Sequence, residues 1–450
     1  MSAAEIVLVS SLAFSLLIWL YLISRRASYS LKVTSLRGSV TSWTFLFLHV
    51  VVTNVVIQSR EHNELVESGL SFQNIVQIAV ILSAFLWAVW VLLRGWVPLS
   101  NFTRNCNIWM IALVGVYAVT TTWSVWPELT ALRVVELISF WVIVMHLFCH
   151  YDWEDRLGRY LWGITFILVA YALFLVVVAV INDLNILKLA RSNLGGMVAA
   201  VLMLYVSYRV IYTKERSVVG VLGWSFPLLA LLLFNSLASL VAFGAALCVL
   251  LFFRGGSYFR AALISVFISL FVVNIMLITE GNWSSKDNWL YQTAKLVGKN
   301  ERQLTTFSGR FPLWKELWVQ LKDEPAGLGY VAGERLFEVI FSASKSTGWK
   351  ASNAHNGYVS TWVGAGWLGI VLLLLLFISV IRKCLNSNLR TKPFLVSTVV
   401  LIAINNMTLV AVGGQLSPGW VVLLAFCAIP STVRSKNNVY VEALTSKGNN

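Results

Sequence analysis

Two side chains in one polar stretch of the sequence could move a proton and hold a phosphate group. His355 and Asn356 come directly before an apolar run, which predicts an imidazole at a membrane–water boundary. An imidazole that titrates near neutrality can accept a proton from a sugar hydroxyl. Arg310 lies in the same stretch, and its guanidinium is a planar fork of donors that fits phosphate oxygens. Each has a plainer alternative: a histidine bonded to a loop carbonyl, and an arginine facing solvent or lipid headgroups.

The composition defines the class of protein in which these residues must work. Of the 450 residues, 58% are hydrophobic and only 12% are charged, whereas a soluble domain carries about a quarter charged residues. The net charge of +14 is spread over short basic clusters between apolar runs, which is typical of membrane topology and not of nucleic-acid binding. The five cysteines show no CxxC spacing and favour buried small residues over a metal site or a disulfide. These features predict an all-α integral membrane protein.

Apolar runs long enough to cross a bilayer as helices recur along the whole chain. The runs are continuous and do not alternate, which favours helices over the strands of a barrel. They predict 12–13 transmembrane helices, and the division between the two runs in 218–253 is the least distinct. The predicted spans lie near 6–24, 40–58, 71–93, 105–121, 129–149, 158–181, 192–212, 218–234, 236–253, 259–279, 356–381, 394–411 and 416–431.

The distribution of basic residues predicts the orientation of the spans. Twenty Lys and Arg residues lie in one set of alternate loops, and three (Arg60, Lys188 and Arg191) lie in the short loops of the other set. The first set is therefore predicted to be cytoplasmic. We expect about ten spans in 1–279, one large outward segment over 280–355, about three spans in 356–433 and a cytoplasmic tail over 434–450.

The outward segment is predicted to carry short amphipathic helices. Trp314, Leu317, Trp318 and Leu321 recur at helical spacing with charged residues between them, a pattern that indicates a helix lying on the membrane or on the top of the bundle. The glycines of 327–330 follow and permit a close backbone approach. A structural cap over the bundle is the alternative to a functional segment.

Other charged residues indicate their roles less specifically. Arg133 and Glu136 lie three residues apart within a span, where a charge is costly and is usually paired. We expect a structural pair near the outer surface, or a role for Arg133 in binding substrate. Glu61 and Glu64 crowd the first outer loop without a specific metal motif, so no metal site is predicted.

Six sequence blocks together resemble the O-antigen ligase and O-antigen and exopolysaccharide polymerase superfamily. They are FSGRFPLW at 307–314, GLGY at 327–330, SNAHNGYVSTWVGAGWLG at 352–369, TTWSVWPELTALRVVELI at 121–138, ARSNLGGMVAAVLML at 190–204 and LLLFNSLASLVAFGAAL at 231–247. One feature departs from the pattern of many ligases, which carry an arginine in a Ser-Arg element of the mid-chain helix pair. Here that stretch reads Asn235-Ser236-Leu237-Ala238-Ser239 and contains no arginine. Arg191 is predicted to substitute for that arginine, and the departure brings the chain closer to the polymerases.

This resemblance implies an inverting, metal-independent glycosyltransferase of the GT-C type that needs no cofactor. Its donor would be a glycan on undecaprenyl pyrophosphate, and its acceptor another lipid-linked glycan or lipid A-core. The family's histidine maps onto His355, which would deprotonate the acceptor, and its loop arginine onto Arg310, which would hold the pyrophosphate. The residues predicted to bind pyrophosphate or glycan are Arg191, Asn193, Asn356, Arg133, Trp314, Gly329 and Tyr330.

The leading hypothesis is a polymerase of lipid-linked repeat units in the bacterial inner membrane, with its active site facing the periplasm. A ligase that transfers the glycan to lipid A-core is the alternative within the same chemistry. A transporter or flippase for the same lipid is the alternative of another class, and it would require ionisable residues near the middle of the bilayer. The implied partners are the lipid-linked donor, the acceptor, membrane lipid and a chain-length regulator.

Overall fold

The protein is described from a computed structural model, which defines residues 36–53, 72–103, 106–150, 152–181, 192–213, 218–234, 236–256, 310–333, 354–387 and 389–430. Over these residues the fold is all helical. The α-helices are α2 (Leu36–Val51), α3 (Phe72–Leu93), α4 (Asn107–Val119), α5 (Pro127–Phe148), α6 (Trp153–Ile181), α8 (Asn193–Tyr212), α9 (Val218–Leu233), α10 (Leu237–Arg254), α14 (Arg310–Leu321), α16 (Gly357–Asn386), α17 (Lys392–Asn406) and α18 (Pro418–Ala428), and short 3-10 turns lie at Leu99–Asn101 and Thr120–Thr122.

Eleven of the predicted spans coincide with described helices, from α2 to α10 and from α16 to α18. The remaining two, near 6–24 and 259–279, lie outside the described residues, as does the predicted C-terminal tail. Five of the described helices (α3, α5, α6, α8 and α16) are long and apolar enough to cross a membrane on their own. The prediction of an all-α integral membrane protein is confirmed.

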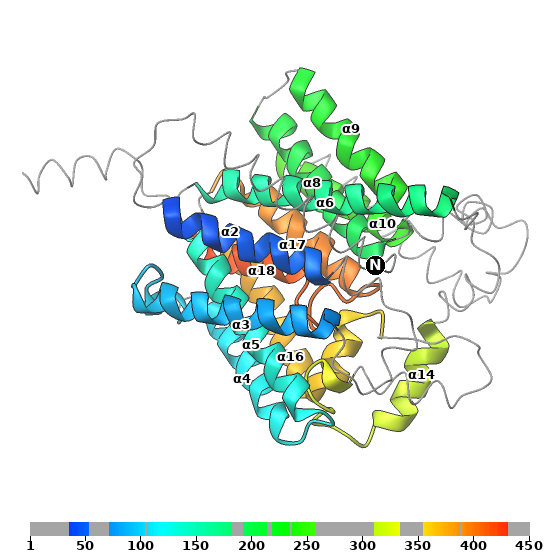
Figure 1. The fold of residues 1–450 in the computed structure, drawn as a ribbon. Coiled ribbons are helices and arrows are strands. Elements are labelled where there is room, and N and C mark those ends of the chain that lie inside the picture. The colour runs from blue at the N-terminus through cyan, green and yellow to red at the C-terminus, as the bar shows by residue number, and fades with distance from the viewer. Residues whose placement is uncertain are drawn as a thin grey trace, which may run out of the picture.

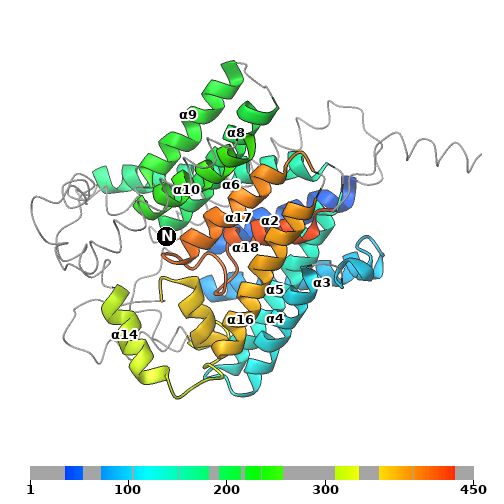
Figure 2. The same cartoon turned by 180° about the vertical axis from the view of Figure 1, so that it is seen from behind.

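The helices form one bundle in which some elements are enclosed by protein and others present an apolar outer face. Helix α18 is buried along its whole length, with Trp420 in its first turn, and α8 is buried over most of its turns. In contrast, α3 exposes Leu82, Leu86 and Leu93, which only a lipid environment would accept in such number. Helix α3 packs on α5, α16 on α4, and α10 on α17 (Figures 1 and 2).

Several helices begin at residues whose side chains supply the missing backbone partners. Ser192, Ser236, Asn356 and Ser417 each cap a helix by accepting a hydrogen bond from a backbone N–H of the first turn. Pro127 occupies the first position of α5, where the absent N–H costs nothing. These local signals place the starts of α5, α8, α10, α16 and α18.

Helix α16 is not one continuous rod. Its 30 residues would span about 45 Å as a single helix, which exceeds the roughly 30 Å hydrocarbon core of a bilayer. The backbone breaks at Gly366, which has φ 64°, a left-handed conformation that glycine adopts readily. The first part, from Gly357 to Ala365, therefore forms a separate short helix ahead of the span.

Helix α14 lies at one end of the bundle and crosses the direction in which α3 and α6 run (Figures 1 and 2). Leu313, Leu317 and Leu321 form its buried side and pack against Trp362 and Val363 of the first part of α16. The predicted helical spacing in this segment is confirmed, and one side of the helix rests on the bundle. We call this end of the molecule the α14 end.

Candidate functional site

His355 occupies a strained position at the start of α16. Its backbone φ is 49°, in the left-handed region that residues with a side chain seldom adopt. Asn356 follows as the helix cap, and its Oδ1 accepts hydrogen bonds from the backbone N–H groups of Tyr358 at 2.9 Å and Val359 at 3.2 Å. The cap fixes where the helix begins, so the chain must turn sharply at His355. Strain of this kind costs about 1–3 kcal/mol and is concentrated at functional sites.

Arg310 begins α14, and one hydrogen bond attaches this helix beside His355. The indole N–H of Trp314 donates to the carbonyl oxygen of Ala354 at 2.9 Å. Ala354 is itself fully buried in the small apolar cluster formed by α14 and the first part of α16. Arg310 lies one helical turn from Trp314 and His355 is next to Ala354, so this bond brings together the two residues that the sequence predicted as catalytic.

The electrostatics of His355 reflect this proximity. Burial disfavours its charged form and is the larger effect, and the positive charge of Arg310 acts in the same direction, so the pKa of His355 falls to about 4. The imidazole is therefore neutral at neutral pH, with a lone pair that can accept a proton. The guanidinium of Arg310 therefore lies within electrostatic reach of the His355 imidazole.

Residues 325–330, which include the glycines of 327–330, form backbone hydrogen bonds with α16 on both sides of its break. The backbone N–H groups of Leu328 and Gly329 donate to the carbonyls of Val363 at 2.7 Å and Gly364 at 3.0 Å, and that of Trp367 donates to Pro325 at 3.2 Å. These bonds satisfy backbone groups that the break would leave without helical partners. Stretch 327–330 and the first part of α16 consequently form a single unit.

Gly329 and Tyr330, both predicted to contact substrate, are buried by protein. A Cβ atom on Gly329 would lie 2.1 Å from Oγ of Ser124, so no side chain fits there. The Tyr330 ring stacks on Tyr117 with ring centroids 3.9 Å apart, and its hydroxyl donates to the carbonyl of Gly414 at 2.7 Å. In the structure, Gly329 and Tyr330 contact other parts of the protein and support the fold. Their predicted contact with substrate stays a prediction.

Asn193 takes part in a polar network that joins α8, α10 and α17. Its Oδ1 accepts a hydrogen bond from Ser236 Oγ at 3.2 Å, and Ser239 Oγ donates to Asn405 Oδ1 at 3.0 Å. Ser236 also caps α10, since its side chain accepts a hydrogen bond from the backbone N–H of Ser239. Arg191, which was predicted to replace the arginine that many ligases carry, lies outside the described residues.

The expected pair of Arg133 and Glu136 is present, and a third residue joins it. Nη1 of Arg133 lies 2.9 Å from Oε2 of Glu136, and Nε2 of His49 on α2 lies 2.8 Å from Oε1 of the same carboxylate. The side chains of Arg133 and Glu136 are only 3% and 1% exposed, so the carboxylate is matched by partners on both sides. His49 was not predicted, although a histidine inside an apolar span signals such a partner.

The connection between α17 and α18 was also not predicted as part of the site. Oδ1 of Asn406 accepts hydrogen bonds from the backbone N–H groups of Ala411 at 3.1 Å and Val412 at 2.8 Å. A Cβ atom on Gly357 would lie 2.0 Å from the same Oδ1, so the connection lies directly against the start of α16. Its sequence signals are the pair of glycines at 413–414 and two successive asparagines at the end of an apolar run.

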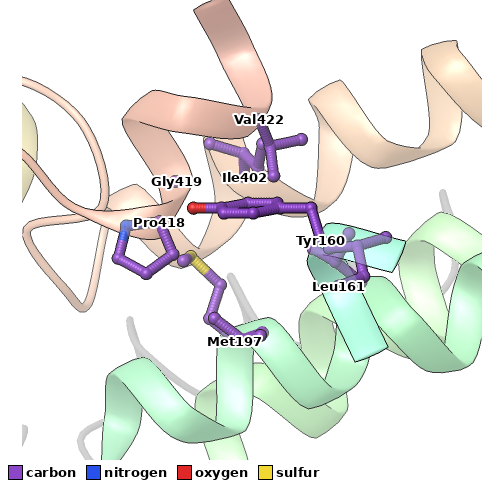
Figure 3. A pocket seen from close by; sticks show the side chains of 9 residues that line it. Tyr160, Leu161, Met197, Ile402, Pro418, Gly419 and Val422 are labelled. Atoms are coloured by element: carbon purple, nitrogen blue, oxygen red, sulfur yellow. The ribbon is translucent and has the colours of Figure 1, made fainter. Parts of the chain in front are cut away.

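A small cavity among the described residues lies apart from the α14 end. The cavity between α6, α8, α17 and α18 is small and apolar, and Figure 3 shows the Tyr160 ring lying across it between Met197 and Val422. None of the predicted site residues lines that cavity. Within the described ranges, no group of three or more His, Cys, Asp or Glu residues is placed to hold a metal ion, and Glu61 and Glu64 lie outside those ranges.

A helical bundle with several helices able to cross a bilayer and with apolar outer faces defines a multi-pass integral membrane protein. Residues 222–374, about a third of the chain, match a family model described as O-Antigen ligase. The match confirms the resemblance to the O-antigen ligase and polymerase superfamily, and it includes both Arg310 and His355. It implies a membrane enzyme of the glycosyltransferase type, with lipid-linked glycan and acceptor substrates. No curated protein and no solved structure gives a match.

Proposed function

We propose that this protein is a metal-independent glycosyltransferase that polymerises oligosaccharide repeat units linked to undecaprenyl pyrophosphate. The observation that carries the proposal is the meeting of Arg310 and His355. Their segments are joined by the bond between Trp314 and Ala354, and the charge of Arg310 acts on the imidazole of His355, although 44 residues separate the two in the sequence. Transfer from a sugar pyrophosphate requires these two groups: one to hold the leaving group and one to take the acceptor proton.

In the proposed step, the acceptor hydroxyl attacks the anomeric carbon of the donor sugar. The new carbon–oxygen bond forms as the bond between that carbon and the pyrophosphate oxygen breaks, with inversion at the carbon. The hydroxyl proton passes to the imidazole of His355, and the electron pair of the broken bond leaves on undecaprenyl pyrophosphate. Arg310 binds the pyrophosphate oxygens and stabilises the charge that develops on them.

Donor binding also prepares His355 for this role. In the free protein the charge of Arg310 helps to hold the pKa of His355 at about 4. A bound pyrophosphate neutralises that charge, which removes one cause of the lowered pKa and makes the imidazole a stronger base. The base is thus strengthened when the donor is in place, which couples proton transfer to donor binding.

The test uses purified protein in lipid nanodiscs with a synthetic lipid-linked repeat unit. We expect His355→Ala to abolish polymer formation while insertion and folding are retained, because the acceptor proton then has no base. His150→Gln is the matched control, since His150 is a half-buried histidine outside the α14 end. Normal chain length from His355→Ala would show that the catalytic assignment is wrong. Activity that survives a chelator supports the metal-free route, and its loss would direct attention to Glu61 and Glu64.

Ligase activity is the second candidate, and the description of the matching family favours it. The same two residues would perform the same bond exchange, with lipid A-core as the acceptor. Supplying both acceptors in one reaction distinguishes the candidates: products that grow by repeat units indicate a polymerase, and a single transfer to lipid A-core indicates a ligase. We favour the polymerase because the mid-chain stretch from Asn235 to Ser239 lacks the arginine that many ligases carry in this element.

A further inference from the structure

Three tryptophans form a cluster where α14 meets the break in α16. The ring centroid of Trp318 lies 5.5 Å from that of Trp362 and 6.1 Å from that of Trp367, and the last two are 6.0 Å apart. Trp362 is buried, whereas Trp318 is 51% exposed and Trp367 is 49% exposed. Two large aromatic surfaces are therefore open on one side of the α14 end, and a buried indole supports them from beneath.

The exposed side of Trp367 continues along the span of α16. Leu368, Val371, Leu374 and Ile378 follow it at helical spacing, and all four are exposed. A continuous exposed apolar stripe on a helix of this hydropathy faces lipid hydrocarbon. Trp367 is the first residue of that stripe, so it lies at the level where lipid hydrocarbon gives way to headgroups, a position that tryptophan prefers.

Helix α14 presents a second apolar surface at this level. Its leucines are turned toward the bundle, yet Trp318 and Val319 are exposed on another side. Lys315 and Lys322 are exposed between them on the helix surface, which places positive charges beside the apolar groups. Tryptophan with flanking lysines is the composition of helices that lie in the headgroup layer, where the lysines meet lipid phosphates.

We propose that α14 is an interfacial helix that rests in the headgroup layer of the lipid bilayer through Trp318, Val319 and Trp367. Helix α14 crosses the direction in which α3 and α6 run (Figures 1 and 2). The lipid surface continues from the stripe on α16 across Trp367 to Trp318 without a break. This contact holds Arg310, at the start of α14, at the height of lipid phosphates. The inference concerns membrane contact and does not require the proposed reaction.

A glycan platform is the competing use for exposed tryptophans. Sugar rings stack on flat aromatic faces, whereas the Trp318 ring makes angles of 32° with Trp362 and 74° with Trp367. The exposed rings thus do not form one plane, and Trp367 is continuous with the lipid-facing stripe. These observations favour lipid as the occupant.

The test measures the depth of spin labels in the full-length protein, reconstituted in nanodiscs that contain anionic phosphatidylglycerol. Single cysteines at Val319 and, as the matched control, at the exposed Gln320 on another side of the same helix are labelled after the native cysteines are replaced by serine. We expect label 319 to be several-fold more accessible to oxygen, relative to a water-soluble nickel chelate, than label 320. Equal accessibility of the two labels to the nickel chelate would overturn the proposal.

A second measurement avoids replacing the native cysteines. A photo-crosslinking amino acid at Val319 should capture phospholipid in the otherwise unchanged protein, and one at Gln320 should not. Capture of water or solvent at both positions would overturn the proposal. If position 319 were shielded from solvent crosslinking only after a lipid-linked oligosaccharide is added, the surface would bind glycan. That result would overturn the proposal as well.

Discussion

The indole N–H of Trp314 donates to the carbonyl oxygen of Ala354, and this bond connects two segments that lie 40 residues apart in the sequence. One segment carries Arg310 and the other carries His355. Arg310 begins α14, and His355 stands in the turn that precedes α16. The relative position of the two side chains therefore depends on the side of α14 that packs against the start of α16.

The first prediction concerns this bond. Trp314→Phe keeps an aromatic ring but removes the N–H, which leaves a buried carbonyl without its partner and costs about 1–3 kcal/mol. We expect glycan transfer to fall roughly tenfold, because small displacements of catalytic groups are costly in rate. Initial rates in nanodiscs measure the effect. Trp162→Phe on α6 is the control, and equal rates for the two variants would contradict the positioning role of Trp314.

The second prediction concerns pH. Since a base with a lowered pKa remains neutral to a lower pH, the wild-type kcat/KM, which reports the free protein, should persist under mild acid and fall as the pH approaches about 4. Arg310→Gln removes one of the two causes, so the acid midpoint should move upward toward the ordinary histidine value of about 6.5. Burial remains, so the shift should be incomplete.

Modification of His355 with diethylpyrocarbonate, followed peptide by peptide in a mass spectrometer, gives the same midpoint without depending on activity. His150 provides an internal reference in each sample. If Arg310→Gln and the wild type gave superimposable modification profiles, Arg310 would not act on His355.

The third prediction concerns the break in α16. A Cβ atom at Gly366 would lie 1.8 Å from the carbonyl oxygen of Pro325, and the positive φ adds strain for any other residue. Gly366→Ala should therefore destabilise the protein by at least about 1–3 kcal/mol. Gly115→Ala on α4 is the control, since no atom lies within 4 Å of its added Cβ. Thermal unfolding in detergent compares the two, and equal midpoints would show that the break is not required.

The fourth prediction separates structure from substrate binding at Arg133. Glu136→Gln leaves a buried guanidinium without its counter-charge, which costs about 3–5 kcal/mol. Replacing both residues, as Arg133→Met with Glu136→Leu, removes both charges and should recover most of this loss, less the cost of leaving His49 without its hydrogen-bond partner. We expect the double variant to retain glycan transfer. If the double variant inserted and folded but transferred no glycan, the result would indicate that Arg133 binds substrate.

Much of the fold follows from local features of the sequence. The spans are readable because an apolar run needs no partner to be recognised, and the caps at Ser192, Asn356 and Ser417 stand directly before such runs. The break at Gly366 was not predicted, because its cause is the distant stretch 325–330 that bonds to it. His49 was missed for the same reason: its partner, Glu136, is 87 residues away. Arg310 and His355 were predicted through a family resemblance, and their proximity required a structure.

The backbone hydrogen bonds between residues 325–330 and α16 have a consequence for the evolution of the chain. The segment between Gly333 and Ala354 joins the two halves of the site, but contacts on either side of it set how those halves fit together. A chain that preserves these contacts therefore preserves the relative position of Arg310 and His355.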